Sequence, residues 1–166
     1  MLLTRIAGLS LIAAVTCGIG WAYAQQKTSR PTLTVEDYLE IQQLYARYSQ
    51  TIDSGERDGA AWAETFTPDG VFGNASGRTA LTEFAKHRPD RWNGAQSRHW
   101  ISNLIITPTS EGASGSCYLL TMNVSVRPPV LNSAGVYADT LVKTSEGWRF
   151  KKRILQGDAV AAPARR

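Results

Sequence analysis

Residues 34–53 read TVEDYLEIQQLYARYSQTID and predict an amphipathic helix at the start of the folded domain. Thr34 is a good N-cap because its hydroxyl can accept a hydrogen bond from an unpaired backbone N–H, and Glu36 and Asp37 place negative charge in the first turn, where the helix dipole favours it. Large side chains then recur at steps of three or four residues, at Tyr38, Ile41, Tyr45, Tyr48 and Ile52. This stripe predicts that one side of the helix packs against a core. Residues 54–55 (SG) end it.

The sequence after this helix changes its period. Residues 57–66 and 79–87 predict two shorter helices, with a brief strand at Val71–Phe72 between them. From residue 97 onward, β-forming residues alternate with a period of two, which predicts strands over residues 97–107, 118–127, 135–143 and 148–150. Helices followed by antiparallel strands are typical of the α+β class. A curved sheet wrapped over these helices would enclose an apolar interior, and its open end is a natural place for a ligand.

Residues 1–24 predict a secretory signal peptide. Arg5 is the only charge, an apolar run follows, and Ala22-Tyr23-Ala24 supplies the small residues that flank a cleavage point, so cleavage is expected before Gln25. Two alternatives remain open: an uncleaved membrane anchor, because the run approaches the ~20 residues that span a bilayer, and a lipoprotein, because Cys17 lies in the run. Export predicts a periplasmic or secreted protein that meets a membrane only through an uncleaved signal.

The remaining chain predicts one domain. Residues 25–32 are polar and contain Pro31, so we interpret them as a linker, and residues 158–166 as a flexible tail. The domain therefore covers residues 33–157. After cleavage Cys117 is the sole cysteine, so no internal disulfide can form, and we expect this thiol to be buried.

Composition excludes several functional classes. The chain has 166 residues with 43% hydrophobic and 19% charged residues, which is typical of a folded domain. A net charge of +4 with scattered basic residues does not predict nucleic-acid binding. Two histidines and two cysteines are too few for the common multi-histidine or thiolate metal sites, and no glycine-rich phosphate loop is present. We therefore expect neither a metal nor a cofactor.

Several short motifs together resemble the SnoaL-like family of the nuclear transport factor 2-like superfamily. They are Tyr45-Ala46-Arg47-Tyr48 with Asp53, Phe66-Thr67-Pro68-Asp69-Gly70, Arg98-His99-Trp100, and Tyr137-Ala138-Asp139 before Gly147-Trp148-Arg149-Phe150. The resemblance covers about residues 33–156. It implies a cone-shaped α+β fold in which three N-terminal helices pack in a curved antiparallel or mixed sheet around a pocket, and it implies a homodimer. Members include scytalone dehydratase, bile-acid dehydratase, lindane dehydrochlorinase and ketosteroid isomerase, while others only bind or assemble, so the fold does not fix the function.

The resemblance also implies a candidate site. In the dehydratase and dehydrochlorinase relatives an acid at the end of the first helix orients a histidine on the first long strand, and these positions fall on Asp53 and His99. Imidazole is a suitable base near neutral pH, and a carboxylate neighbour fixes its tautomer. Tyr48 matches the position of a functional tyrosine, and Lys143 lies near that of an arginine that helps a leaving group depart. Scytalone dehydratase has a tyrosine directly before its acid, where this chain has Ile52, so that particular substrate is not expected.

Plain structural roles stay open for the same residues. Tyr48 is consistent with core packing, Asp53 with a turn residue that bonds its own backbone, and His99 with a core histidine, because both sides of strand 97–107 carry apolar residues.

The sequence thus favours an exported, cofactor-independent lyase or isomerase that removes a proton from a small apolar organic molecule. His99 would be the base, Asp53 its orienting partner, and Tyr48 and Lys143 polar helpers. The expected apolar walls of the pocket are Trp62, Phe66, Phe72, Trp100, Tyr118 and Met122. The alternative is a periplasmic module that binds a ligand without reacting with it, or that serves mainly to dimerise.

Overall fold

The computed structural model describes residues 31–87 and 96–158. The predicted signal segment 1–24, residues 25–30 of the linker and residues 159–166 of the tail lie outside these ranges. Among the described residues no helix is long and apolar enough to cross a membrane.

The first helix forms where the sequence predicts it. Helix α2 spans Val35–Ser54, and Thr34 caps it through a capping box in which Thr34 and Asp37 each accept a hydrogen bond from the other's backbone N–H. The helix ends at Gly55, which adopts a left-handed conformation with φ 66°. Its buried side chains include four of the five predicted stripe residues, together with Leu44.

The second predicted helix is shorter than expected. Residues 57–66 contain a 3-10 turn, η1 (Glu56–Gly59), and a single helical turn, α3 (Ala60–Ala63). Arg57 and Asp58 have φ near 51° and Gly59 has φ 88°, which interrupts the helix. Glycine is required at position 59 because a Cβ there would lie 2.7 Å from the Cβ of Ala85 in α4 (Gly77–Lys86). Sequence periodicity does not show this close approach to α4. The segment therefore forms a 3-10 turn and one helical turn where the sequence predicted one continuous helix.

Six strands form one mixed sheet in the order β2-β1-β6-β5-β4-β3. Their bounds are β1 Phe66–Phe72, β2 Ala75–Ser76, β3 Ser97–Thr109, β4 Gly112–Asn123, β5 Val130–Thr144 and β6 Gly147–Gly157. The β1–β6 pair is parallel and the other pairs are antiparallel. Three of the four long strands extend the predicted ones, whereas β4 begins six residues before the predicted strand 118–127 and ends four residues before its predicted end. The sheet is not closed.

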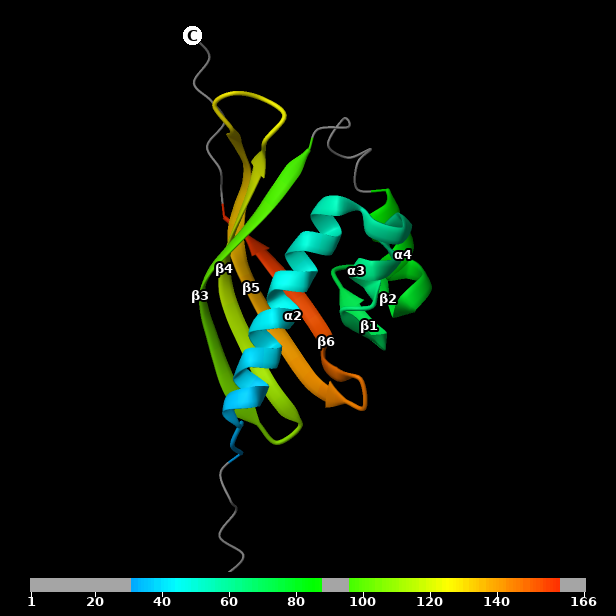
Figure 1. Ribbon diagram of the computed structural model, residues 1–166, viewed down its shortest axis with the longest axis vertical. Coiled ribbons are helices and arrows are strands. Elements are labelled where there is room, and N and C mark those ends of the chain that lie inside the picture. The colour runs from blue at the N-terminus through cyan, green and yellow to red at the C-terminus, as the bar shows by residue number, and fades with distance from the viewer. Residues whose placement is uncertain (1–30, 88–95, 159–166) are drawn as a thin grey trace, which may run out of the picture. The chain divides into compact units, whose positions relative to one another are not determined.

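One face of the sheet carries the helices. In Figure 1, α2 lies across the long strands β4, β5 and β6, while α3, α4 and the short strands β1 and β2 gather to one side. The inner face therefore forms the core together with α2, and its fully buried members include Cys117, Leu119, Tyr137, Leu141 and Phe150. The structure confirms the predicted cone-like α+β fold and the burial of Cys117.

Candidate functional site

A cavity of about 310 Å³ lies between the C-terminal half of α2, the β1–α4 region and the inner face of the sheet. Its apolar lining residues are Ile52, Phe72, Phe84, Leu119 and Leu155, and its polar ones are Tyr48, His99, Thr121, Ser133 and Tyr137. An apolar cavity with a few convergent polar groups is the usual form of a small-molecule site.

Asp53 and His99 form a hydrogen-bonded pair at this cavity. The Oδ1 atom of Asp53 lies 2.6 Å from His99 Nδ1, and its Oδ2 atom accepts the backbone N–H of His99 at 2.8 Å. Because a carboxylate only accepts, the short contact requires a proton on Nδ1 and directs Nε2 away from Asp53. Both side chains are largely buried, with 8% of Asp53 and 7% of His99 exposed. The structure thus brings together two residues that lie 46 positions apart in the sequence.

The position of each partner follows from its element. Asp53 lies in the last turn of α2, just before Gly55 ends the helix, so its side chain can reach beyond the helix end. His99 is the third residue of β3 and pairs with Thr121 of β4, and side chains at paired positions project from the same face of a sheet. Thr121 is buried on the inner face, so His99 points inward as well.

Two tyrosines line the cavity together with the histidine. The hydroxyl oxygens of Tyr48 and Tyr137 lie 3.3 Å apart, and both residues are 1% exposed while lining the cavity. The Tyr48 ring meets the His99 ring edge to face, with centroids 6.4 Å apart. Burial raises the pKa of both tyrosines, against the opposing effect of the nearby positive charge of Arg153. Both hydroxyls therefore stay protonated near neutral pH and can donate hydrogen bonds.

A buried ion pair lies behind the tyrosines. Arg153 donates from Nε and Nη2 to the two carboxylate oxygens of Asp139, each at 2.7 Å, and neither side chain is exposed. The Tyr45 hydroxyl donates to Asp139 Oδ2 at 2.5 Å. The guanidinium carbon also lies 4.0–4.7 Å from the ring centroids of Tyr45, Tyr48, Tyr137 and Phe150. The positively charged guanidinium of Arg153 therefore contacts the rings of both cavity tyrosines.

A second polar pair lines the cavity on the sheet side. The hydroxyl oxygens of Thr121 and Ser133 lie 2.5 Å apart on the paired strands β4 and β5. One hydroxyl donates to the other, which leaves the second proton able to bind an acceptor. The cavity therefore offers hydrogen-bonding groups at His99, at the tyrosine pair and at this hydroxyl pair.

The structure does not bring Lys143 to the cavity. Its ammonium group donates to Asp37 Oδ1 at 2.8 Å near the start of α2, whereas Asp53 lies at the other end of that helix. The indole N–H of Trp148 donates to the same oxygen of Asp37 at 2.9 Å. Lys143 thus serves a structural contact, and the buried cation near the site is Arg153.

The six residues expected to form the pocket walls divide into two groups. Phe72 lines the cavity, and Trp62 and Phe66 are fully buried in the core beside it, with ring centroids 5.5 and 6.0 Å from that of Tyr48. The expectation for the other three is corrected. Trp100 and Tyr118 are 53% and 57% exposed, because strand alternation sends them to the outer face, opposite His99 and Leu119. Met122 alternates with inward-facing Thr121 and does not line the cavity either.

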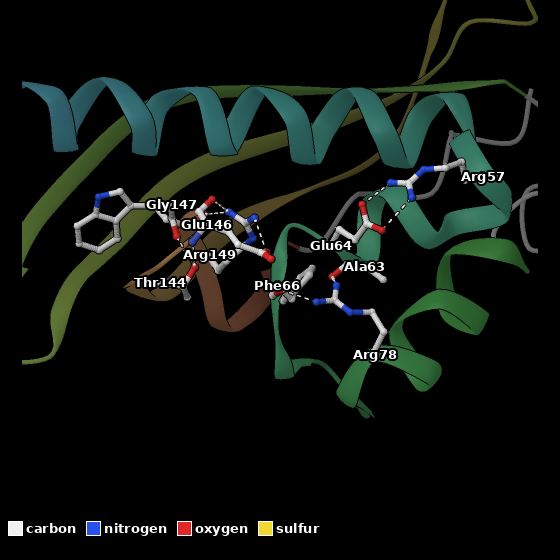
Figure 2. A network of polar contacts seen from close by, with 10 residues as sticks. Arg57, Ala63, Glu64, Phe66, Arg78, Thr144, Glu146, Gly147 and Arg149 are labelled. Carbon is white, nitrogen blue, oxygen red and sulfur yellow. Dashed lines mark hydrogen bonds and ion pairs between the residues drawn. The ribbon is translucent and has the colours of Figure 1, made fainter.

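A larger groove of about 690 Å³ lies along the C-terminal half of α2, and most of its lining residues are polar or charged. Figure 2 shows two ion pairs from that lining, Arg57 with Glu64 and Arg149 with Glu146. It also shows Arg78, which does not line the groove and donates to the carbonyl oxygens of Ala63 and Phe66, so that it holds the start of β1 to α4. We place the candidate site in the smaller cavity because His99 and the tyrosine pair line it.

Sequence reasoning missed Tyr137, Thr121, Ser133, Asp139 and Arg153. The available signal was alternation, since Asp139 and Arg153 occupy the inner positions of their strands and are directly paired between β5 and β6. Charged residues at core positions of a strand indicate a paired or functional group. Within residues 31–87 and 96–158, no group of three or more metal-ligating side chains forms a candidate metal site.

Comparisons with known proteins identify the family to which this fold belongs. The model of the SnoaL-like domain matches residues 33–154. A protein of unknown function from Mycobacterium tuberculosis is 30% identical over 75% of this chain and 73% of its own, with a TM-score of 0.65. ActVI-ORFA from Streptomyces coelicolor is 28% identical over 78% of this chain and all of its own, with a TM-score of 0.64. A Catenulispora acidiphila protein in complex with S-DNPA is 27% identical over 75% of this chain and 95% of its own, with a TM-score of 0.66. No curated protein matches significantly.

Proposed function

Because this chain belongs to the SnoaL-like family, we propose that it is a cofactor-independent lyase or isomerase that removes a proton from carbon in a small apolar organic molecule. The observation that carries the proposal is the Asp53–His99 pair, whose histidine lines a cavity that Tyr48 and Tyr137 also line. A base and a hydrogen-bond donor facing one apolar space are the two groups that proton abstraction next to a carbonyl requires.

The proposed reaction starts with proton transfer to His99 Nε2 from the carbon beside a carbonyl group. The electron pair of the broken C–H bond forms a C=C bond, and the carbonyl π electrons move onto oxygen to give an enolate. The tyrosine hydroxyls stabilise that charge by hydrogen bonding. In isomerisation the substrate carries a β,γ-double bond, so the enolate is a dienolate and the imidazolium returns the proton to its γ carbon while the carbonyl re-forms. In elimination the enolate re-forms the carbonyl and expels a β-hydroxyl group, which leaves with the proton from His99 as water.

Asp53 acts in this scheme through His99. Its Oδ1 accepts from Nδ1, which selects the tautomer whose Nε2 can take a proton, and its negative charge stabilises the imidazolium that forms. The second contact, from the His99 backbone N–H to Oδ2, fixes the carboxylate against the strand. The pair is therefore held in place before a substrate binds.

The cavity favours neutral, largely apolar substrates. Half of its lining residues are apolar, and none of them is an aspartate, glutamate, lysine or arginine. A carboxylate or phosphate group would lose its hydration without gaining a cationic partner. The bound S-DNPA in the Catenulispora acidiphila protein supports small-molecule binding in a relative of this fold.

Hydrogen exchange tests the proposal with simple ketones in place of the natural substrate. The protein is incubated in heavy water with a panel of cyclic ketones, and deuterium at the carbon beside the carbonyl is followed by NMR. We expect exchange well above the buffer rate, with a loss of about 10²–10⁴-fold in His99→Ala. His87→Ala is the matched control, because His87 is the other histidine of the chain and its side chain is 62% exposed at the end of α4. Equal exchange in wild type and His99→Ala would overturn the assignment.

A ligand-binding module without catalysis is the second candidate. It predicts that the same ketones bind and stabilise the protein thermally while wild type exchanges no faster than His99→Ala. Thermal stabilisation and hydrogen exchange, measured on the same samples, therefore distinguish ligand binding alone from catalysis.

We further propose that two copies associate through the outer face of the sheet. This face exposes large apolar side chains at Trp100, Ile105, Tyr118, Leu120 and Ile154, and groups of exposed apolar side chains often mark an interaction surface. Sedimentation velocity should give a dimer for wild type and a monomer for Trp100→Glu with Leu120→Glu. A wild-type monomer at micromolar concentration would rule this interface out.

Export is the remaining part of the proposal. The pattern of residues 1–24 supports a cleaved signal peptide, with the mature chain starting at Gln25. Fractionation of a bacterial host followed by intact-mass measurement should find the mature form outside the cytoplasm. An intact N-terminus in the membrane fraction would instead indicate an uncleaved anchor.

A further inference from the structure

The buried guanidinium of Arg153 does not line the cavity, yet it is the charged group next to the cavity tyrosines. It is 0% exposed, its Nε and Nη2 atoms are bound to Asp139, and its carbon lies 4.1 Å from each of the Tyr48 and Tyr137 ring centroids. The third nitrogen, Nη1, finds no hydrogen-bond acceptor among the described residues. An unpaired buried donor costs about 1–3 kcal/mol, so its retention calls for an explanation.

The ion pair contacts Tyr45 differently from the two cavity tyrosines. Tyr45 gives its proton to Asp139, so that hydroxyl is committed to the anion. The guanidinium of Arg153 instead lies over the ring faces of Tyr48 and Tyr137, where it holds both rings in place and its positive charge favours electron density on their hydroxyl oxygens. These two hydroxyls are 3.3 Å apart, so one donates to the other and one proton remains for a further acceptor. Both residues line the cavity, which is where that proton can be used.

We propose that Arg153, held by Asp139, is a positioning residue that orients the Tyr48–Tyr137 pair as a hydrogen-bond donor for a carbonyl oxygen bound in the cavity. This assignment rests on the proposed function and names its substrate class, neutral carbonyl compounds. Arg153 also opposes the rise that burial causes in the pKa of both tyrosines, so the two hydroxyls would be weaker hydrogen-bond donors without it.

Tyr45 provides a control residue within the same cluster. It contacts the same ion pair and its ring lies 4.7 Å from the guanidinium, but it does not line the cavity. Tyr45→Phe removes one hydrogen bond to Asp139 and keeps the ring, the ion pair and both cavity hydroxyls. It is therefore the matched control for Tyr48→Phe, which removes a hydroxyl at the cavity.

Infrared spectroscopy of a bound ketone tests the donor site directly. The probe is 2-tetralone with carbon-13 at the carbonyl, and the protein carries His99→Ala so that the ketone does not react. We expect the carbonyl stretch to move to lower frequency on binding, to move back in part in Tyr48→Phe, to return to its value in an apolar solvent in Tyr48→Phe with Tyr137→Phe, and to keep its shifted value in Tyr45→Phe. A bound ketone whose stretch is the same in the tyrosine-containing protein and in the double variant would overturn the donor site.

Substitution of Arg153 tests the positioning role. Arg153→Lys keeps the positive charge and Arg153→Met removes it. In the hydrogen-exchange assay we expect Arg153→Met to lower kcat by about 10²-fold or more with little change in KM, with partial recovery in Arg153→Lys. A folded Arg153→Met protein with wild-type kcat and an unchanged carbonyl stretch would overturn the proposal.

The two readouts also keep the inference separate from the proposed function. If wild type catalyses no exchange while the carbonyl stretch still depends on Tyr48 and Arg153, catalysis is refuted and the donor site stands. If hydrogen exchange depends on His99 while the carbonyl stretch does not change on substitution of Tyr48 or Arg153, the donor site is refuted and the assignment of His99 as the base is kept. Should Arg153→Met fail to fold, the Tyr48→Phe and Arg153→Lys spectra carry the test.

Discussion

Gly115 of β4 lies directly against the hydroxyl of Tyr45 in α2: a Cβ at position 115 would lie 2.0 Å from that oxygen. The glycine lets the tyrosine reach across the sheet to Asp139, which is the strand residue paired with Gly115 on β5. The approach of helix to sheet at this point therefore depends on the absence of one side chain.

Gly115→Ala should displace Tyr45 and weaken its hydrogen bond to Asp139. Overpacking of this kind costs about 1–3 kcal/mol, which we expect as a loss in the free energy of unfolding by urea denaturation. Gly157→Ala is the control, because a Cβ there meets no atom within 4 Å, and it should change stability by less than about 0.5 kcal/mol. Equal stability of the two variants would contradict the close contact.

Asp139→Asn should destabilise the protein more than any surface substitution. It leaves the fully buried Arg153 without its anionic partner, and breaking a buried ion pair from one side costs about 3–5 kcal/mol. The double variant Asp139→Leu with Arg153→Leu should be less damaging than the sum of the two single changes, since it removes both charges. A double-mutant cycle in urea measures this, and simple additivity would show that the two charges are not coupled.

The acid stability of the fold should depend on Asp37. Hydrogen bonds from Lys143, from the Thr34 backbone N–H and from Trp148 hold the pKa of Asp37 well below its usual range. A depressed carboxylate pKa contributes stability that is present above the unfolded-state pKa of about 4 and is lost as pH falls toward the folded-state value. The difference in Tm between wild type and Asp37→Asn should thus be full at neutral pH and shrink below about pH 4. A pH-independent difference would exclude an electrostatic origin.

Cys117 should be chemically inert in the native protein. It is 1% exposed on the inner face of β4, and burial raises the pKa of its thiol to about 12, so almost no thiolate exists near neutral pH. In a Cys17→Ser background, a disulfide reagent should therefore react only after unfolding. Rapid reaction of the folded protein would show that the inner face opens readily.

The tautomer of His99 offers a test of the pair that needs no substrate. Nitrogen-15 NMR should show the proton on Nδ1, where Asp53 accepts it, and Asp53→Asn should change the balance of tautomers because a neutral amide can either donate or accept. The exposed His87 should be unaffected by this substitution. An Nε2-protonated His99 in wild type would contradict its assignment as the base.

Much of the fold could be predicted because its signals are local. The cap at Thr34, the stripe through Tyr48 and Ile52, and the left-handed end at Gly55 all act within one or two helical turns. The pairing of Asp53 with His99 was expected only from the resemblance to relatives. Their sequence separation of 46 residues gives no local signal. At 100° per residue Asp53 also falls on the flank of the apolar stripe of α2, so helical periodicity does not show which way its side chain points.

The sequence by itself determined that a capped amphipathic helix precedes alternating strands. The 3.6-residue period of a helix and the two-residue period of a strand both appear in the order of apolar and polar residues within a short segment. Only the tertiary structure decided which side of each strand faces the helix. Alternation defines two faces but does not say which one is covered, and the approach of α2 selected the face with Gly115, Cys117 and Leu119. That choice turned His99 inward and Trp100 outward, and the β5–β6 register joined Asp139 to Arg153 behind the cavity.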